Sequence, residues 1–219
     1  MSLSPTSELE AINTMLTSIG EQPVQSIVNL AGLSDASIAQ QILLNVSRSV
    51  QSRGWIFNTD LDEVLTPATV GDNKGVIVLG ENVLRVDTTN RIRTSTQDII
   101  ERGRKLWDRK NNTDVFTEGT KISVDQVKLL SFKDLPEPAR RFITLRSARI
   151  FHDRVVGSDS LHKFFKEDEE QAWTQLLDYE GEVADYNIFD NYDVYRVLDR
   201  GPYPTFSLTK NLIDSTETA

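Results

Sequence analysis

The stretch from Ser34 to Asn58, SDASIAQQILLNVSRSVQSRGWIFN, constrains the fold more than any other part of the chain. Ser34 and Asp35 can cap a helix here, because their side chains accept hydrogen bonds from its first free N–H groups. Gly54 tolerates the left-handed conformation that ends a helix, and the run Trp55–Phe57 has strand propensity. Apolar residues recur at helical spacing between these signals, namely Ile38, Ala39, Ile42, Leu43, Val46 and Val50. The pattern predicts a helix, with Arg53 in its last turn, that leads into a strand.

A shorter helix is predicted before this one. Ser7-Glu8-Leu9-Glu10 fits a capping box, in which Ser7 caps the helix and Glu10 reaches back to the backbone of Ser7. Pro23 disfavours helical geometry in the residue before it, so the helix cannot continue through the following turn. Its apolar face and its end are predicted at Leu9, Ile12, Leu16, Ile19 and Gly20.

From Trp55 to about Phe132 the sequence changes to short β-prone runs separated by clusters of Gly, Asn and Asp. The last run alternates only partly between apolar and polar residues, which predicts a bulge or a register change there. We predict a small antiparallel sheet or partial barrel inserted between helices. The runs are Trp55–Phe57, Val76–Leu79, Val83–Val86, Lys105–Trp107 and Ile122–Leu130.

Two further helices are predicted after the β-prone region. Asp134 can cap the first of these helices, Pro136 is tolerated in its first turn, and Gly157 ends it. The second has a near-heptad stripe: Leu161, Phe165, Asp168, Ala172, Leu176, Tyr179, Val183 and Tyr186. Asp168 falls on this stripe, so either it is buried against an arginine of the preceding helix or the stripe turns away from the core there.

These patterns predict an α+β protein: a four-helix bundle with an inserted small antiparallel β domain and an extended C-terminal arm. Residues 1–54 form the N-terminal helices of the bundle, 55–133 the β domain, 134–186 the C-terminal helix pair and 187–219 the arm. The helices are expected to share one core, because apolar stripes cannot stay exposed in a soluble chain. The predicted core residues are Ile42, Val46, Val50, Trp55, Phe142, Ile150, Phe165 and Leu176.

The chain carries no recognised catalytic motif. It lacks the glycine-rich phosphate loops, H-E-x-x-H and G-x-S-x-G, and the absence of cysteine excludes disulfides and thiolate chemistry. His152 and His162 are its only histidines, and His152-Asp153 is most simply a polar pair at a helix end. We predict no catalytic residue, no cofactor and no metal site. Carboxylate pairs among the 33 Asp and Glu keep a glycoside hydrolase acting on host surface polysaccharide as the alternative.

The formal charge of −9 argues against a general nucleic-acid binder, because phosphate binding needs clusters of basic residues. It is compatible with a protein past which DNA slides. No apolar run approaches the ~20 residues that span a bilayer, and the N-terminus does not read as a secretion signal. We therefore expect no membrane association.

Four stretches resemble, in the same order and spacing, the tail tubular protein A family of adaptor (gatekeeper) proteins in T7-like short-tailed phages. They are T-S-I-G-E-Q-P-V at Thr17–Val24, S-R-S-V-Q-S-R-G-W-I-F-N at Ser47–Asn58, L-W-D-R-K-N-N-T-D-V-F at Leu106–Phe116, and Leu135–Ala172, which runs from L-P-E-P-A-R-R-F to K-E-D-E-E-Q-A. The resemblance implies a structural role in the virion tail. A monomeric binding module is the other class of non-enzyme that remains open.

The resemblance also implies partners. In that family twelve copies form a ring under the capsid portal, the nozzle protein (tail tubular protein B) docks beneath it, and side fibres attach near its outer junctions. DNA passes through the central channel. We accordingly expect a dodecameric ring that contacts portal, nozzle protein and tail fibres, meets DNA without sequence-specific binding, and assembles in the cytoplasm of the bacterial host.

The segment after Asp185 is rich in aromatic residues, unlike most disordered chain ends. Pro202 and Pro204 block helix there and stiffen the chain. Aromatic side chains with polar tips are enriched in protein interfaces. We predict that this arm packs on a neighbouring subunit or on the portal through Tyr186, Phe189, Tyr192, Tyr195, Tyr203 and Phe206.

Overall fold

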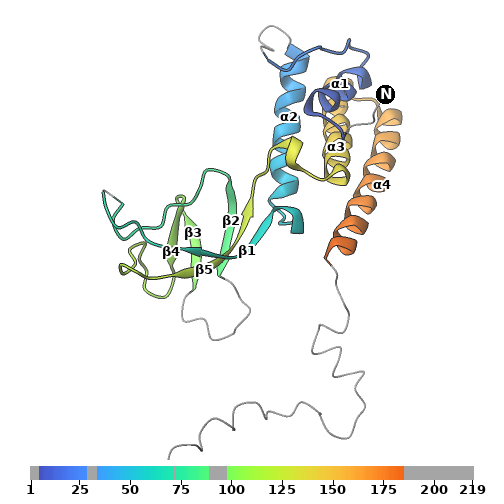
Figure 1. Ribbon diagram of the computed structural model, residues 1–219. Helices are drawn as coiled ribbons and strands as arrows, with labels where there is room; N and C mark the ends of the chain where they lie inside the picture. Colours follow the sequence, from blue (N-terminus) through green and yellow to red (C-terminus); the bar gives the residue numbers. More distant parts are fainter. Residues whose placement is uncertain (1–4, 29–33, 72, 89–97, 185–219) are drawn as a thin grey trace, which may run out of the picture. The chain divides into compact units, whose positions relative to one another are not determined.

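A computed structural model describes residues 5–28, 34–71, 73–88 and 98–184 (Figure 1). Within these ranges the chain is α+β, with four α-helices and two small antiparallel sheets, which confirms the predicted fold class. The helices are α1 (Glu8–Ser18), α2 (Ser34–Gln51), α3 (Glu137–Val155) and α4 (Asp159–Val183), and two short 3-10 turns are η1 (Ile56–Asn58) and η2 (Phe132–Asp134). All of these helices and strands lie in one unit, Met1–Val183.

The helix ends follow local sequence chemistry. The capping box of α1 is confirmed: Ser7 Oγ accepts the Glu10 N–H, and the Glu10 carboxylate accepts the Ser7 N–H at 2.7 Å. The hydrogen bond from the Ser7 backbone lowers the pKa of Glu10. Gly54 and Gly157 take the left-handed conformation, with φ of 80° and 68°, where the sequence predicts helix ends.

The helices enclose one cluster of buried apolar side chains. Helices α1, α2 and α3 pack against one another in pairs, and α4 packs along α3 (Figure 1). Of the residues expected in the core, the cluster contains Ile42, Val46, Val50, Trp55, Phe142 and Leu176. Ile150 is half-buried against it, and Phe165 is half-buried beside His152.

The stripe along α4 is narrower than expected. Ala172 and Leu176 are buried, but Leu161, Asp168 and Val183 are exposed. Among the described helices α4 has its main contact with α3, so only a short face of it needs to be apolar.

The larger sheet has the strand order β1-β5-β2, from β1 (Thr59–Leu65), β5 (Ile122–Lys128) and β2 (Val83–Thr88). The smaller sheet pairs β3 (Ile99–Arg102) with β4 (Lys105–Asp108). Both neighbours of β5 shift register against it, which confirms the irregularity predicted for this strand. A second buried cluster fills this part: Ile77, Leu79, Val86, Ile99, Leu106, Phe116, Ile122 and Val124.

Some local predictions are wrong, two of them at the turns η1 and η2. The strand expected at Trp55–Phe57 is the turn η1, because the Asn58 side chain accepts the Trp55 N–H at 2.8 Å and closes a tight turn before β1 begins. Asp134 does not cap α3; it ends η2 and accepts a hydrogen bond from the Ser131 hydroxyl, and α3 begins directly after Pro136.

Candidate functional site

Two buried amide side chains join the helices to the larger sheet. Gln51, at the end of α2, is fully buried; its amide donates to the Leu130 carbonyl at 3.1 Å and accepts the Leu130 N–H at 2.7 Å. Asn58 donates to the carbonyls of Gln51 and Lys128, at 2.9 and 2.8 Å. The chain leaves α2 and returns toward α3 at these points. We call the set Gln51, Trp55, Asn58 and Leu130 the junction.

Helix α4 also contacts the junction. Trp173 packs edge-on against Trp55, with ring centroids 5.5 Å apart, and the Arg53 guanidinium lies 4.8 Å from the Trp173 ring. Arg53 therefore stacks on aromatic rings rather than lying in the last turn of α2, which ends at Gln51. Glu180, near the end of α4, accepts the Ile56 N–H at 2.8 Å.

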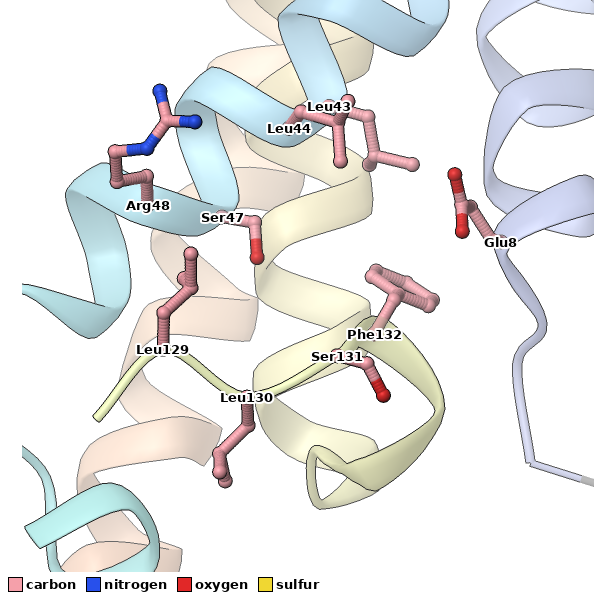
Figure 2. Close-up of a pocket in the computed structure, with 9 residues that line it drawn as sticks. All are labelled: Glu8, Leu43, Leu44, Ser47, Arg48, Leu129, Leu130, Ser131 and Phe132. Atoms are coloured by element: carbon pink, nitrogen blue, oxygen red, sulfur yellow. The ribbon is translucent and has the colours of Figure 1, made fainter. Parts of the chain in front are cut away.

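A pocket of about 350 Å³ lies beside the junction, between α2 and the segment Leu129–Phe132 (Figure 2). Figure 2 places Arg48 and Glu8 on opposite sides of it. Apolar side chains make up most of its lining: Leu43, Leu44, Leu129, Leu130 and Phe132. Such a pocket suits an apolar side chain of a partner, and sequence reasoning missed it because Leu129 and Leu130 were assigned to a strand.

Charged side chains connect α3 to α4. Arg149 on α3 donates to the carboxylate of Glu169 on α4, and also lies 3.2 Å from Asp153. Arg146 lies 3.7 Å from the same Glu169. The hydrogen bond to Glu169 is the largest cause that raises the pKa of Arg149. The acidic partner of the arginines is thus Glu169, whereas Asp168 is exposed, so the stripe turns away from the core at Asp168.

His152 differs from the expected polar residue at a helix end. It is fully buried on α3, its ring lies 5.2 Å from the Phe165 ring, and neither ring nitrogen has a hydrogen-bond partner among the described residues. Phe165 belongs to α4, so α4 contributes to the cover of this position. His162 instead contacts the Asp153 carboxylate at 2.9 Å.

Comparison with known proteins identifies the family to which the chain belongs. The family model described as tail tubular protein matches residues 9–186, most of the chain. The chain belongs to the tail tubular protein family. None of the curated proteins compared with it matches. Membership makes this tail tubular protein a structural component of the phage tail.

No group of three or more His, Cys, Asp or Glu among the described residues is placed to hold a metal ion. None of the helices that the structure covers is long and apolar enough to cross a bilayer. The polar groups detailed above, in the junction and between α3 and α4, join one element to another.

The structure brings together only part of the predicted site. Six of the eight predicted core residues lie in the buried cluster of the helices, and Trp55 also belongs to the junction. All six predicted interface aromatics, Tyr186, Phe189, Tyr192, Tyr195, Tyr203 and Phe206, lie outside the described residues. The interface of the arm therefore stays a prediction.

A variant of Glu169 tests the link between α3 and α4 in this tail tubular protein. Glu169→Gln is expected to lower the free energy of unfolding by about 1–3 kcal/mol, because it removes a charge held by two arginines in a largely buried position. Asp168→Asn, one residue away and exposed, is the matched control and should change little. Urea unfolding measures both, and equal losses in the two variants would contradict the assignment.

Proposed function

We propose that the protein is the ring-forming adaptor of a short-tailed phage, joining the capsid portal to the tail nozzle and lining the DNA exit channel. The observation that carries this proposal is the match to the tail tubular protein family over residues 9–186. All four stretches that resemble the tail tubular protein A family lie inside that range. The number of copies, twelve, and the attachment of tail fibres follow from the same resemblance.

The junction supports an adaptor that contacts different partners with different parts. The buried side chains of Gln51 and Asn58 hold the helices and the larger sheet together through hydrogen bonds, so a load on either part is carried to the other. In this proposal the four helices form a bundle, and the subunits assemble in the host cytoplasm before they join the virion.

Electron microscopy of the purified protein mixed with portal tests the proposal most directly. A ring seated on the portal, and a mass corresponding to about twelve chains, are the expected results. A protein that stays monomeric with portal present would be a binding module instead. Release of sugar from host polysaccharide, abolished by a single carboxylate substitution, would show the hydrolase alternative to be correct.

The C-terminal arm provides a second test of assembly. We propose that residues 187–219 pack on a neighbouring subunit or on the portal through aromatic side chains. Deleting Tyr203–Ala219 is expected to leave the monomer folded but to weaken ring formation or portal attachment at least tenfold. Assembly by the truncated protein at wild-type concentrations would rule out this role, and thermal unfolding of the monomer is the control for folding.

DNA in the channel should meet little attraction from this protein. With a formal charge of −9, the chain is not expected to bind duplex DNA tightly at physiological salt. Fluorescence anisotropy with labelled duplexes of two unrelated sequences measures this. Tight binding, or a preference between the two sequences, would contradict the proposed passage of DNA.

A further inference from the structure

A hollow of about 190 Å³, distinct from the pocket of Figure 2, lies between α2 and α3. A cavity of roughly 150 Å³ with apolar walls holds a benzene ring, so this hollow has room for one aromatic side chain. Apolar side chains of both helices contribute to its lining, which consists of Ile42, Asn45, Val46, Ser49, Arg146, Ile150 and Arg154.

The charge at this hollow is positive. Arg146 and Arg154 of α3 line it, and none of the described residues in its lining is acidic. Arg146 is already held by Glu169 of α4, at 3.7 Å. Arg154, in contrast, is exposed and has no hydrogen-bond or ion-pair partner among the described residues. The hollow therefore combines an apolar space with an unpaired cation.

The side chain of Phe164, on α4, has the size and the apolar character that this hollow can accept. Its ring is 64% exposed, and every other aromatic side chain in the described part of the chain is buried or half-buried. Leu161, one turn earlier on the same helix, is also exposed. Helix α4 packs along α3 (Figure 1), but Phe164 is not part of the lining of the hollow. An aromatic anchor that enters a pocket of its partner is typical of the centre of a protein interface.

Two carboxylates lie beside Phe164 on the helix surface. Glu167 and Asp168 follow it by three and four residues, the spacing of neighbours on one face of a helix. Both are exposed, and neither has a partner among the described residues. Lys163 and Lys166, one residue before and two after Phe164, lie on other sides of the helix, and Lys166 is held in an ion pair within α4. The exposed ring is thus accompanied by unpaired negative charge.

We propose that Phe164 of one copy fills the hollow between α2 and α3 of the next copy, with Glu167 beside Arg154. The ring covers the apolar side chains of the hollow, and the carboxylate supplies the partner that the arginine lacks. Because the ring and the hollow are different parts of the surface, the contact is head-to-tail and repeats from copy to copy until a ring closes. The inference rests on the proposed ring-forming function and identifies one contact that builds the ring.

Cysteine crosslinking tests the contact, since the chain has no cysteine of its own. Ser49→Cys lies in the lining of the hollow and Lys163→Cys lies next to Phe164, so the aromatic ring and the two paired charges stay in place. The two proteins, mixed and assembled with portal, are expected to crosslink to each other through a short bismaleimide. Leu44→Cys is the matched control for Ser49→Cys, because Leu44 is on the same helix and exposed but lines the pocket of Figure 2 instead.

The outcomes separate this contact from the proposed function. Rings that form on portal in electron micrographs but give no crosslink between Ser49→Cys and Lys163→Cys would overturn the contact alone. Equal crosslinking of Lys163→Cys to Leu44→Cys would overturn it as well, because the reaction would then report random collisions. If the wild-type protein forms no ring with portal, the proposed function itself fails and the contact fails with it.

Charge reversal supplies an independent measurement. Arg154→Glu and Glu167→Arg should each weaken ring assembly by about tenfold or more, because each places two like charges across the contact. The double variant Arg154→Glu/Glu167→Arg should restore assembly, and all three proteins should keep the melting temperature of the wild type, since both residues are exposed. Arg141→Glu, at an exposed arginine of α3 that does not line the hollow, is the matched control and should assemble normally. Normal assembly of the single variants, or no recovery in the double variant, would show that the subunits meet through other surfaces.

Discussion

Asn58→Ala is expected to lower the free energy of unfolding by about 3–5 kcal/mol, the largest effect of any single polar substitution described here. The side chain of Asn58 is buried and satisfies three backbone groups: the Trp55 N–H and the carbonyls of Gln51 and Lys128. Alanine leaves all three without this partner, and each buried unsatisfied group costs about 1–3 kcal/mol.

The matched control is Asn45→Ala on the exposed face of α2, which should change stability by less than about 1 kcal/mol. Urea unfolding followed by circular dichroism measures both variants. Because the side chains of Gln51 and Asn58 bond the same short segment, at Leu130 and at Lys128, the double variant Gln51→Ala/Asn58→Ala should lose less than the sum of the single losses. Equal stability of Asn58→Ala and the wild-type protein would show that the junction contributes little.

Leu176→Ala is expected to have the second large effect, lowering the free energy of unfolding by about 2–5 kcal/mol. Leu176 is fully buried in the cluster of the helices, so its truncation removes apolar contacts and leaves a cavity. Ile42→Ala on α2 removes contacts from the same cluster and should cost a similar amount.

Leu177 provides the control, because it is the next residue of α4 and is 42% exposed. Leu177→Ala should cost less than about 1 kcal/mol. If Leu176→Ala and Leu177→Ala unfold at the same urea concentration, the helix does not bury the face that the structure assigns to it. Both substitutions leave the same residue on the same helix, so the difference between them reports burial rather than helix propensity.

The sequence was sufficient to predict the structure wherever that structure depends only on neighbouring residues. The capping box of Ser7 and Glu10, and the helix ends at Gly54 and Gly157, involve partners within one or two turns. It failed at Trp55–Phe57, where strand propensity lost to a hydrogen bond from the Trp55 backbone to Asn58. It also could not give the strand order, because β1 and β5 are separated by most of the β-prone region.

The candidate site depended even more on distant contacts. The pocket beside α2 forms only when Leu129–Phe132 return to the helices, so no local pattern indicates it. The stripe left two alternatives open at Asp168, because a heptad average does not fix the rotation of a long helix. In the structure Asp168 is exposed and the arginines pair with Glu169, the next residue. The burial of His152 likewise reflects a cover to which α4 contributes.

The hydrogen bond between Gln51 and Leu130 spans 79 residues of sequence, and this separation restricts when the chain can fold. During synthesis α2 emerges well before the segment that satisfies its last residue, and β1 emerges before β5, its only strand partner among the described residues. Contacts of such long range close slowly, since loop-closure entropy is lost first. The nascent chain therefore displays Trp55, whose ring packs on Trp173, until α4 has left the ribosome, and fragments that end before Phe132 should aggregate rather than fold.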